Sequence, residues 1–144
     1  MTATVTTSEA GLGNAPRGLK IERVFTTEGV HPYDEVEWDR RDVVQTNWKT
    51  GETVFGQRGV EFPRFWSVNA STIVTSKYFR GALGTPRRES SLRTIIDRVV
   101  KTYGKAGRQF GYFATEDDAQ IFEEELTWML LHQYFSFNSP VWFN

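Results

Sequence analysis

The sequence predicts an α+β fold that is mainly helical and carries one small β-hairpin ahead of its long helices. Short β-prone runs flank a glycine-containing turn between residues 42 and 55, a pattern typical of a hairpin. Further along, apolar residues recur at three- and four-residue spacing over residues 67–79, 86–104 and 115 to about 133. This spacing indicates three helices with one apolar face each.

The composition limits the classes of function. The 17 basic and 18 acidic side chains give a net charge of -1, so no field draws the chain to nucleic acid or to an anionic membrane. No cysteine is present, which excludes disulfides, thiolate metal sites and thiol chemistry by this chain. We find no signal-peptide pattern and no run near the ~20 apolar residues that cross a bilayer. We therefore expect a cytoplasmic protein with neither a nucleic-acid nor a membrane partner.

The N-terminal part predicts a tail, a short strand and the hairpin. Residues 1–17 are rich in Thr, Ala, Gly and Ser without apolar periodicity, so we expect a disordered tail. Apolar and charged residues alternate over residues 19–26, which predicts a half-buried strand. The hairpin near residues 42–57 should be followed by a polar connector over residues 57–64, whose Gly and Pro disfavour regular structure.

Residues 30–41 hold a cluster of charges around one proline. His31, Asp34 and Glu35 carry donor types that bind metals. No second histidine lies nearby, so we favour a loop with a short helical turn and surface ion pairs, and no metal site.

The helices have recognisable ends. Ser67 is placed to cap the first of them. The second should open at Thr85-Pro86, where a cap precedes a proline, and end at Gly104 and Gly107. The loop before it contains Gly81 and Gly84 beside several arginines, but it lacks the strand and the Gly-Lys-Ser/Thr of a phosphate loop. We interpret it as a plain connection.

The last helix begins at Thr115, an N-cap followed by three acids. The acidic run Glu123-Glu124-Glu125 is typical of a solvated face. His132 near the end of the helix is interpreted as a packed or hydrogen-bonded residue and not as a ligand.

The final ten residues, 135–144, leave this helix, turn at Asn138-Ser139-Pro140 and enter an apolar run. This run predicts the start of a strand whose partner strands are not in the sequence, so we expect a larger domain to follow. The hydroxyl of Ser139 and the amide of Asn138 offer contacts for a polar or anionic ligand. The alternative is a simple turn between helix and strand.

Several runs of the sequence, in the same order, closely resemble the N-terminal region of the adenosylcobalamin-dependent (class II) ribonucleotide reductase large chain. The resemblance extends from about residue 19 to the last residue. The runs that carry it are residues 30–36, 42–44, 58–63, 65–70, 75–81 and 135–144.

The resemblance implies an enzyme that reduces ribonucleoside di- or triphosphates to deoxyribonucleotides for DNA synthesis. In this family adenosylcobalamin initiates a cysteine thiyl radical, and an external dithiol such as thioredoxin supplies reducing equivalents. Residues 18–134 correspond to an N-terminal helical domain, and residues 135–144 to the start of a ten-stranded α/β barrel. Ser139 and Asn138 then become candidate substrate contacts, although Asn138 has an equal alternative in capping the preceding helix or holding the turn.

The resemblance also implies what this chain does not carry. The family continues for several hundred residues, and its catalytic cysteines and cobalamin-contacting loops lie in that continuation. We therefore predict an N-terminal fragment that is inactive alone, with no catalytic residue of its own and with the remainder of the reductase as partner. Homodimer formation stays open. The alternative is a non-catalytic helical module that reuses the fold and binds a partner through its aromatic-rich face.

Overall fold

The computed structural model describes residues 17–143 of the chain. Within them the predicted α+β class is confirmed, as a two-stranded antiparallel sheet with four α-helices. The elements in chain order are the 3-10 helix η2 (Pro32–Glu35), β1 (Trp38–Thr46), β2 (Thr53–Pro63), α1 (Val68–Lys77), α2 (Leu92–Gln109), α3 (Glu116–Leu131) and α4 (Ser139–Phe143). The tail expected at residues 1–17 lies almost wholly outside the described residues, and the domain boundary near residue 134 stays a prediction.

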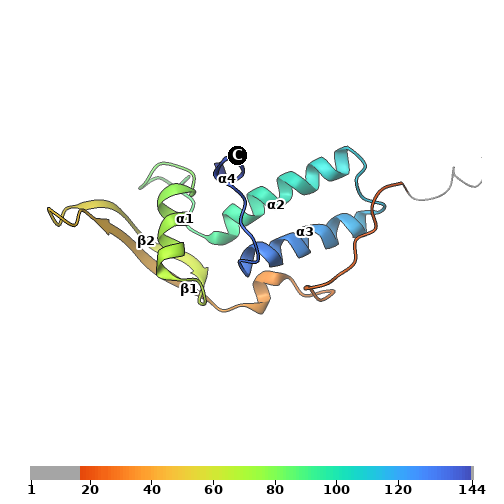
Figure 1. Cartoon of the computed structure of the whole chain (residues 1–144), viewed down its shortest axis with the longest axis horizontal. Coiled ribbons are helices and arrows are strands. Elements are labelled where there is room, and N and C mark those ends of the chain that lie inside the picture. The colour runs from red at the N-terminus through yellow and green to blue at the C-terminus, as the bar shows by residue number, and fades with distance from the viewer. Residues whose placement is uncertain (1–16, 144) are drawn as a thin grey trace, which may run out of the picture.

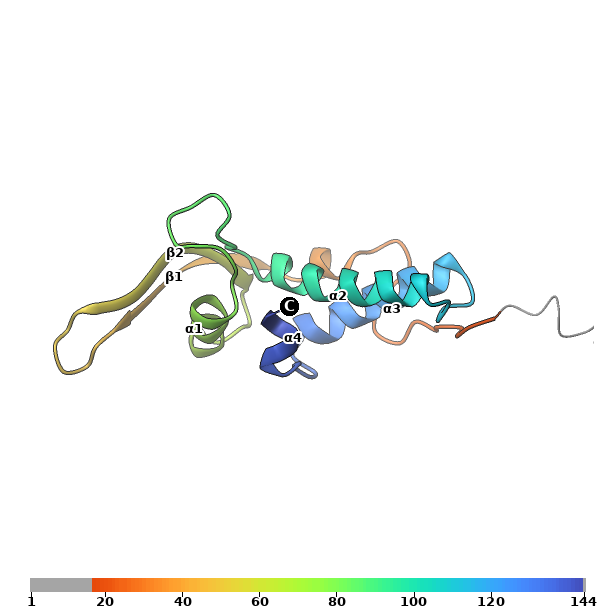
Figure 2. The ribbon, with the colours of Figure 1, turned by 90° about the horizontal axis from the view of Figure 1, so that it is seen from above.

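The molecule is elongated. Figure 1 shows the hairpin projecting at one end and the paired helices α2 and α3 running toward the other. Seen from above in Figure 2, α1 lies beside the base of the hairpin, and α4 lies between α1 and the α2–α3 pair. No helix within residues 17–143 is long and apolar enough to span a bilayer.

The predicted hairpin is confirmed and extends further than expected at both ends. The strands pair from Trp38 opposite Pro63 to Thr46 opposite Thr53, and Gly51 adopts a positive φ of 72° in the connecting turn. The polar connector predicted at residues 57–64 is wrong. Residues up to Pro63 continue β2 because Val60 and Phe62 alternate into the core, where both are fully buried.

The helix α1 follows the prediction, with the Ser67 hydroxyl accepting a hydrogen bond from the Ala70 amide at 3.0 Å. The predicted opening of α2 at residues 85–86 is wrong. The helix begins at Leu92 behind the N-cap Ser91, because residues 85–90 are held against the end of α1. There Arg88 donates to the carbonyls of Thr75 at 2.5 Å and Phe79 at 2.7 Å.

Gly104 and Gly107 do not end α2, which continues to Gln109. Both glycines are buried where α2 meets other parts of the chain. A Cβ atom on Gly107 would overlap the ring of Phe113, and one on Gly104 would overlap the side chain of Glu123. The two glycines permit α2 to pack closely against these side chains. In a sequence, a glycine needed for close packing looks the same as a glycine that ends a helix.

The helix α3 begins as predicted, with a capping box between Thr115 and Asp118. It packs against α2, and their apolar residues share one core with the base of the hairpin. The most deeply buried members of that core are Val60, Phe62, Leu92, Ile95, Ile96 and Leu131.

The strand predicted over residues 19–26 is wrong, because this segment pairs mainly with side chains of α3. Only Leu19 makes a strand-like bridge, to Phe113. The Ile21 amide donates to Asp118 at 2.8 Å, and the amides of Val24 and Phe25 donate to Glu125. The acidic run in α3 is therefore not a solvated face, since Glu125 is buried and satisfies a neighbouring backbone.

Candidate functional site

The two predicted contact residues lie at the junction between α3 and α4, and both are exposed. The Ser139 and Tyr78 hydroxyls form a hydrogen bond of 2.9 Å. The carbonyl of Asn138 accepts from the amides of Val141 at 3.1 Å and Trp142 at 3.4 Å. The Asn138 backbone therefore holds the turn, which is one of the roles predicted for this residue. A substrate contact stays a prediction for both Ser139 and Asn138.

The strand predicted to start after Pro140 is wrong in this structure. Residues Ser139–Phe143 instead form α4, a helix of five residues in which no residue is buried. No strand among residues 17–143 lies beside this segment to offer a ladder of hydrogen bonds, so its amides bond locally to Asn138.

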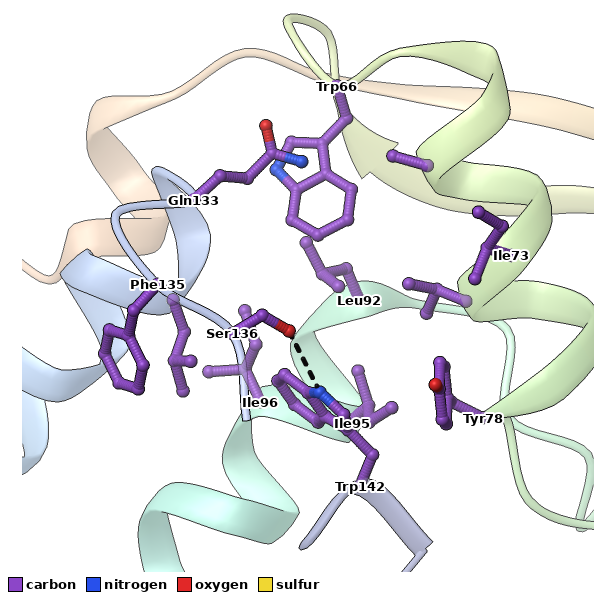
Figure 3. A pocket seen from close by; sticks show the side chains of 13 residues that line it. Trp66, Ile73, Tyr78, Leu92, Ile95, Ile96, Gln133, Phe135, Ser136 and Trp142 are labelled. Carbon is purple, nitrogen blue, oxygen red and sulfur yellow. Dashed lines mark hydrogen bonds between the residues drawn. The ribbon is translucent and has the colours of Figure 1, made fainter. Parts of the chain in front are cut away.

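A cavity of about 390 Å³ lies next to this segment, between α1, the start of α2 and the end of α3. Figure 3 shows Trp66, Tyr78 and Trp142 around it, with Ser136 accepting a 3.2 Å hydrogen bond from the Trp142 indole. The lining side chains that the structure describes carry no charge. They are Trp66, Ala70, Ile73, Val74, Tyr78, Leu92, Ile95, Ile96, Leu130, Gln133, Phe135, Ser136 and Trp142.

Two arginines hold α4 over the cavity through backbone carbonyls. Arg98 on α2 donates to the Trp142 carbonyl at 2.7 Å, and Arg80 donates to the Phe143 carbonyl at 2.8 Å. Arg98 also pairs with Glu89 at 3.1 Å, and both of these side chains are largely buried. The position of α4 therefore depends on charged hydrogen bonds as well as on the Trp142 ring.

Gln133 forms the polar edge of the cavity. Its φ of 58° makes it the one residue other than glycine, within residues 17–143, with a positive φ. Glycine or asparagine is the usual residue at such a helix end, so the sequence carries no signal for this conformation. Gln133 and Trp66 both line the cavity (Figure 3), and the Trp66 indole donates to the Leu131 carbonyl at 2.8 Å.

The groups around the cavity suit binding better than catalysis. The hydroxyls of Tyr78, Ser136 and Ser139 and the carboxamide of Gln133 can donate and accept hydrogen bonds. Nucleophilic or acid-base catalysis generally needs a base or an acid within hydrogen-bonding reach. In the described part of the chain, no acid, histidine or lysine lines the cavity.

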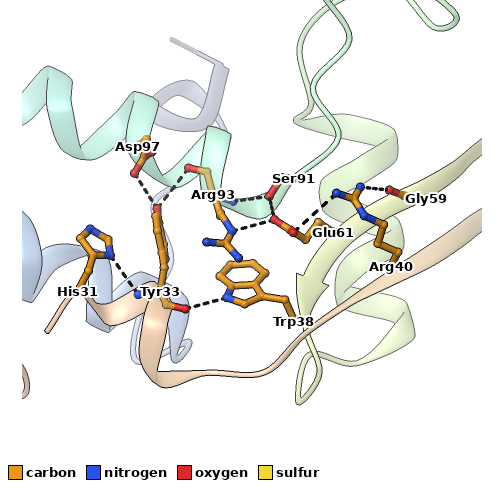
Figure 4. Close-up of polar contacts among 9 residues, drawn as sticks. All are labelled: His31, Tyr33, Trp38, Arg40, Gly59, Glu61, Ser91, Arg93 and Asp97. Carbon is orange, nitrogen blue, oxygen red and sulfur yellow. Dashed lines mark hydrogen bonds and ion pairs between the residues drawn. The ribbon is translucent and has the colours of Figure 1, made fainter.

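A second polar cluster joins the loop around η2 to α2 and β2, as Figure 4 shows. The Tyr33 hydroxyl donates to Asp97 at 2.8 Å, and the Arg93 guanidinium lies 4.1 Å from the centre of the Trp38 ring. Burial raises the pKa of Tyr33, and the negative charge of Asp97 raises it further. Tyr33 is therefore a protonated structural donor.

The same cluster extends to Glu61 on β2, which pairs with Arg93 at 2.8 Å. Burial opposes ionisation of Glu61, but hydrogen bonds from Ser91 and Arg93 outweigh it and lower its pKa. These contacts fix the hairpin base to the start of α2.

His31 and His132 occupy structural positions. His31 accepts from the Tyr33 amide at 3.1 Å and caps η2, as expected for a loop with a short helical turn. His132 packs between Trp128 and Phe65, with ring centres 4.1 and 5.4 Å away, which confirms the packed interpretation. Burial lowers its pKa, against the opposing charge of Glu35. Within residues 17–143 no three His, Asp or Glu side chains gather as a metal site.

Comparison with known proteins gives one family. The family described as class II vitamin B12-dependent ribonucleotide reductase matches residues 40–133. The vitamin B12-dependent ribonucleotide reductase of Streptomyces avermitilis is 70% identical over 132 residues, which are 92% of this chain and 14% of that protein. That of Streptomyces clavuligerus is 70% identical over 90% of this chain, and that of Rhodopirellula baltica 42% identical over 88%. The chain spans 14% of the length of the first two relatives and 12% of the third.

Proposed function

Because the chain belongs to the class II vitamin B12-dependent ribonucleotide reductase family, we propose that it is the N-terminal region of an enzyme that reduces ribonucleotides to deoxyribonucleotides for DNA synthesis. The observation that carries this proposal is the family match over residues 40–133 together with 70% identity to the Streptomyces reductases. The substrate is a ribonucleoside di- or triphosphate, and a dithiol such as thioredoxin supplies the electrons.

Within such an enzyme the chain contributes structure and substrate contacts. It has no cysteine, and a thiyl radical needs a thiol, so the radical and reducing cysteines must belong to another part of the reductase. We propose that the 144 residues alone are inactive and that α2, α3 and the hairpin base support the segment leading to the substrate.

The described residues do not fit a cobalamin site by themselves. The cavity beside α4 has about 390 Å³ and an uncharged, mainly apolar lining, whereas a corrin ring with its polar amide arms is larger than most drug-sized ligands and needs many hydrogen bonds. Both histidines are already packed or capping. We therefore assign adenosylcobalamin to the rest of the reductase and derive no reaction step from it here.

Ser139 and Asn138 are the proposed substrate contacts. Ser139 is exposed, and within residues 17–143 its hydroxyl has one hydrogen-bond partner, Tyr78. A hydroxyl can donate one hydrogen bond and accept two, so it retains capacity for a polar substrate oxygen. Tyr78 would then position Ser139 from α1.

The first test compares two lengths of protein in one assay with ribonucleotide, dithiol and adenosylcobalamin. The full-length polypeptide should form deoxyribonucleotide, and the 144-residue chain should not. Turnover by the 144-residue chain would contradict its assigned role, and a full-length polypeptide without reductase activity would contradict the proposed function.

The second test concerns the substrate contact in the full-length enzyme. Ser139→Ala should raise KM for the ribonucleotide more than it lowers kcat, because a lost binding contact weakens the substrate complex. Ser90→Ala, which removes an exposed hydroxyl on the loop before α2, is the matched control and should leave KM unchanged. Equal KM values for both variants and the parent enzyme would remove Ser139 from the site.

A further inference from the structure

The cavity beside α4 is a pocket of about 390 Å³ that opens to solvent, and Trp142 is the one residue of α4 that lines it. Its mainly apolar lining offers few hydrogen-bond partners to water. Such a pocket can accept apolar side chains from another surface.

The cover over this cavity is also incomplete. No residue of α4 is buried, although three of its five residues are apolar. Two large apolar side chains that line the cavity are exposed to solvent, by 40% at Ile73 and 38% at Phe135. Phe143 of α4 is 56% exposed, and its ring centre lies 5.2 Å from that of Tyr78 at the cavity. Exposed apolar side chains gathered at a pocket commonly mark an interaction site in proteins.

The local sequence does not favour the conformation of this cover. Val141, Trp142 and Phe143 prefer strands, and a helix of five residues is too short to be stable by itself in water. Local preference and observed structure usually agree in a completed fold. Their disagreement at α4 indicates that this side of the module lacks a neighbour.

From these observations we infer that the cavity receives apolar side chains from the remainder of the reductase polypeptide. The inference rests on the proposed function. The region matched by this chain makes up only 14% of the length of the Streptomyces relatives. The rest of such a polypeptide can therefore supply a large surface for contact with this region. Among residues 17–143 the lining carries no charged side chain to bind the phosphates of a nucleotide, which favours an apolar protein surface as occupant.

Site-specific photo-cross-linking in the full-length reductase tests this docking surface. A benzoylphenylalanine placed at Ile73 lies at the cavity, whereas one placed at Val68 lies on the first turn of α1, is 76% exposed and does not line the cavity. Irradiation should link position 73 to peptides from outside the 144 residues, with several times the yield obtained from position 68. Links from position 73 only to this region, to a second copy, or in no greater yield than from position 68 would overturn the inference.

A substitution pair gives a second measurement. Ile73→Asp in the full-length enzyme should speed tryptic cleavage within residues 17–143 severalfold, because a carboxylate at the opening disfavours apolar contact. Val68→Asp should leave the rate unchanged, and equal rates for the two variants would overturn the inference.

Reductase activity of the same cross-linking preparation separates the two claims. Ribonucleotide reduction without cross-linking beyond the region would remove the docking surface and leave the proposed function standing. Absence of ribonucleotide reduction would remove the proposed function.

Discussion

The two sides of the module differ in how completely they are packed. On the α2–α3 side, buried apolar residues, close-packed glycines and a capping box join the two helices, and the pockets there are smaller, about 270 and 170 Å³. On the α1–α4 side, a cavity of about 390 Å³ separates the elements, and α4 buries none of its residues. The difference predicts that substitutions on the first side cost more stability than substitutions on the second, which is the side that we propose as a docking surface.

Truncation of a core residue should show the largest effect. Leu131→Ala removes a side chain that is fully buried and should lower the free energy of unfolding by about 2–5 kcal/mol, because a cavity replaces dense packing. Ile73→Ala, at the edge of the existing cavity, should cost less than about 1 kcal/mol. Urea denaturation of the 144-residue chain measures both values, and similar losses for the two variants would show that the sides are equally well packed.

The polar ties on the α2–α3 side should rank second. Glu125→Ala leaves the amides of Val24 and Phe25 without their acceptor and should cost about 1.5–3 kcal/mol, because hydrogen bonds to a charged group are stronger than those between neutral groups. Glu28→Ala removes an exposed acid and should change stability by less than about 0.5 kcal/mol. If Glu125→Ala behaves like this control, the N-terminal segment is not anchored by α3.

Elements that are fixed by neighbours in the sequence were predicted correctly, and elements that are fixed by distant contacts were not. The start of α3 and the hairpin were predictable, because caps, periodicity and turn residues act between near neighbours in the chain. The start of α2 and the path of residues 19–26 were not, because Arg88 and Glu125 fix them through contacts distant in sequence. For the candidate site, the turn at Asn138 was predictable, whereas the cavity arises only when α1, α2 and α3 are assembled.

Larger side chains on the two sides should change the stability of the chain in opposite directions. Gly107→Ala places a Cβ atom against the ring of Phe113 and should destabilise the chain by about 1–2 kcal/mol through overpacking. Ala70→Leu extends a side chain into the cavity and should be neutral or stabilise by up to about 1 kcal/mol. Thermal unfolding of both variants measures the contrast, and a large loss for Ala70→Leu would mean that the cavity cannot accept an apolar group.

The smallest effect should come from His132, which lies where the two sides meet, between Trp128 of α3 and Phe65 before α1. Burial lowers its pKa in the folded chain below the ordinary value of about 6.5. As pH falls through about 6.5, the unfolded chain binds a proton that the folded chain does not, so the free energy of unfolding decreases. His132→Phe keeps an aromatic ring but cannot titrate, and its stability should therefore fall less than that of the parent chain between pH 7 and pH 5.

Asp118 provides the contrast within the α2–α3 side. Hydrogen bonds from the Ile21 amide and from Thr115 lower its pKa in the folded chain, so its contribution is present above the ordinary pKa of about 3.8 and is lost only as pH falls below that value. Asp118 therefore adds little slope between pH 7 and pH 5, where His132 titrates in the unfolded chain. Urea midpoints of the parent chain and His132→Phe across this range test the assignment. Parallel curves would show that the His132 ring is as accessible to protons in the folded chain as in the unfolded one, and that the junction between the two sides is open to water.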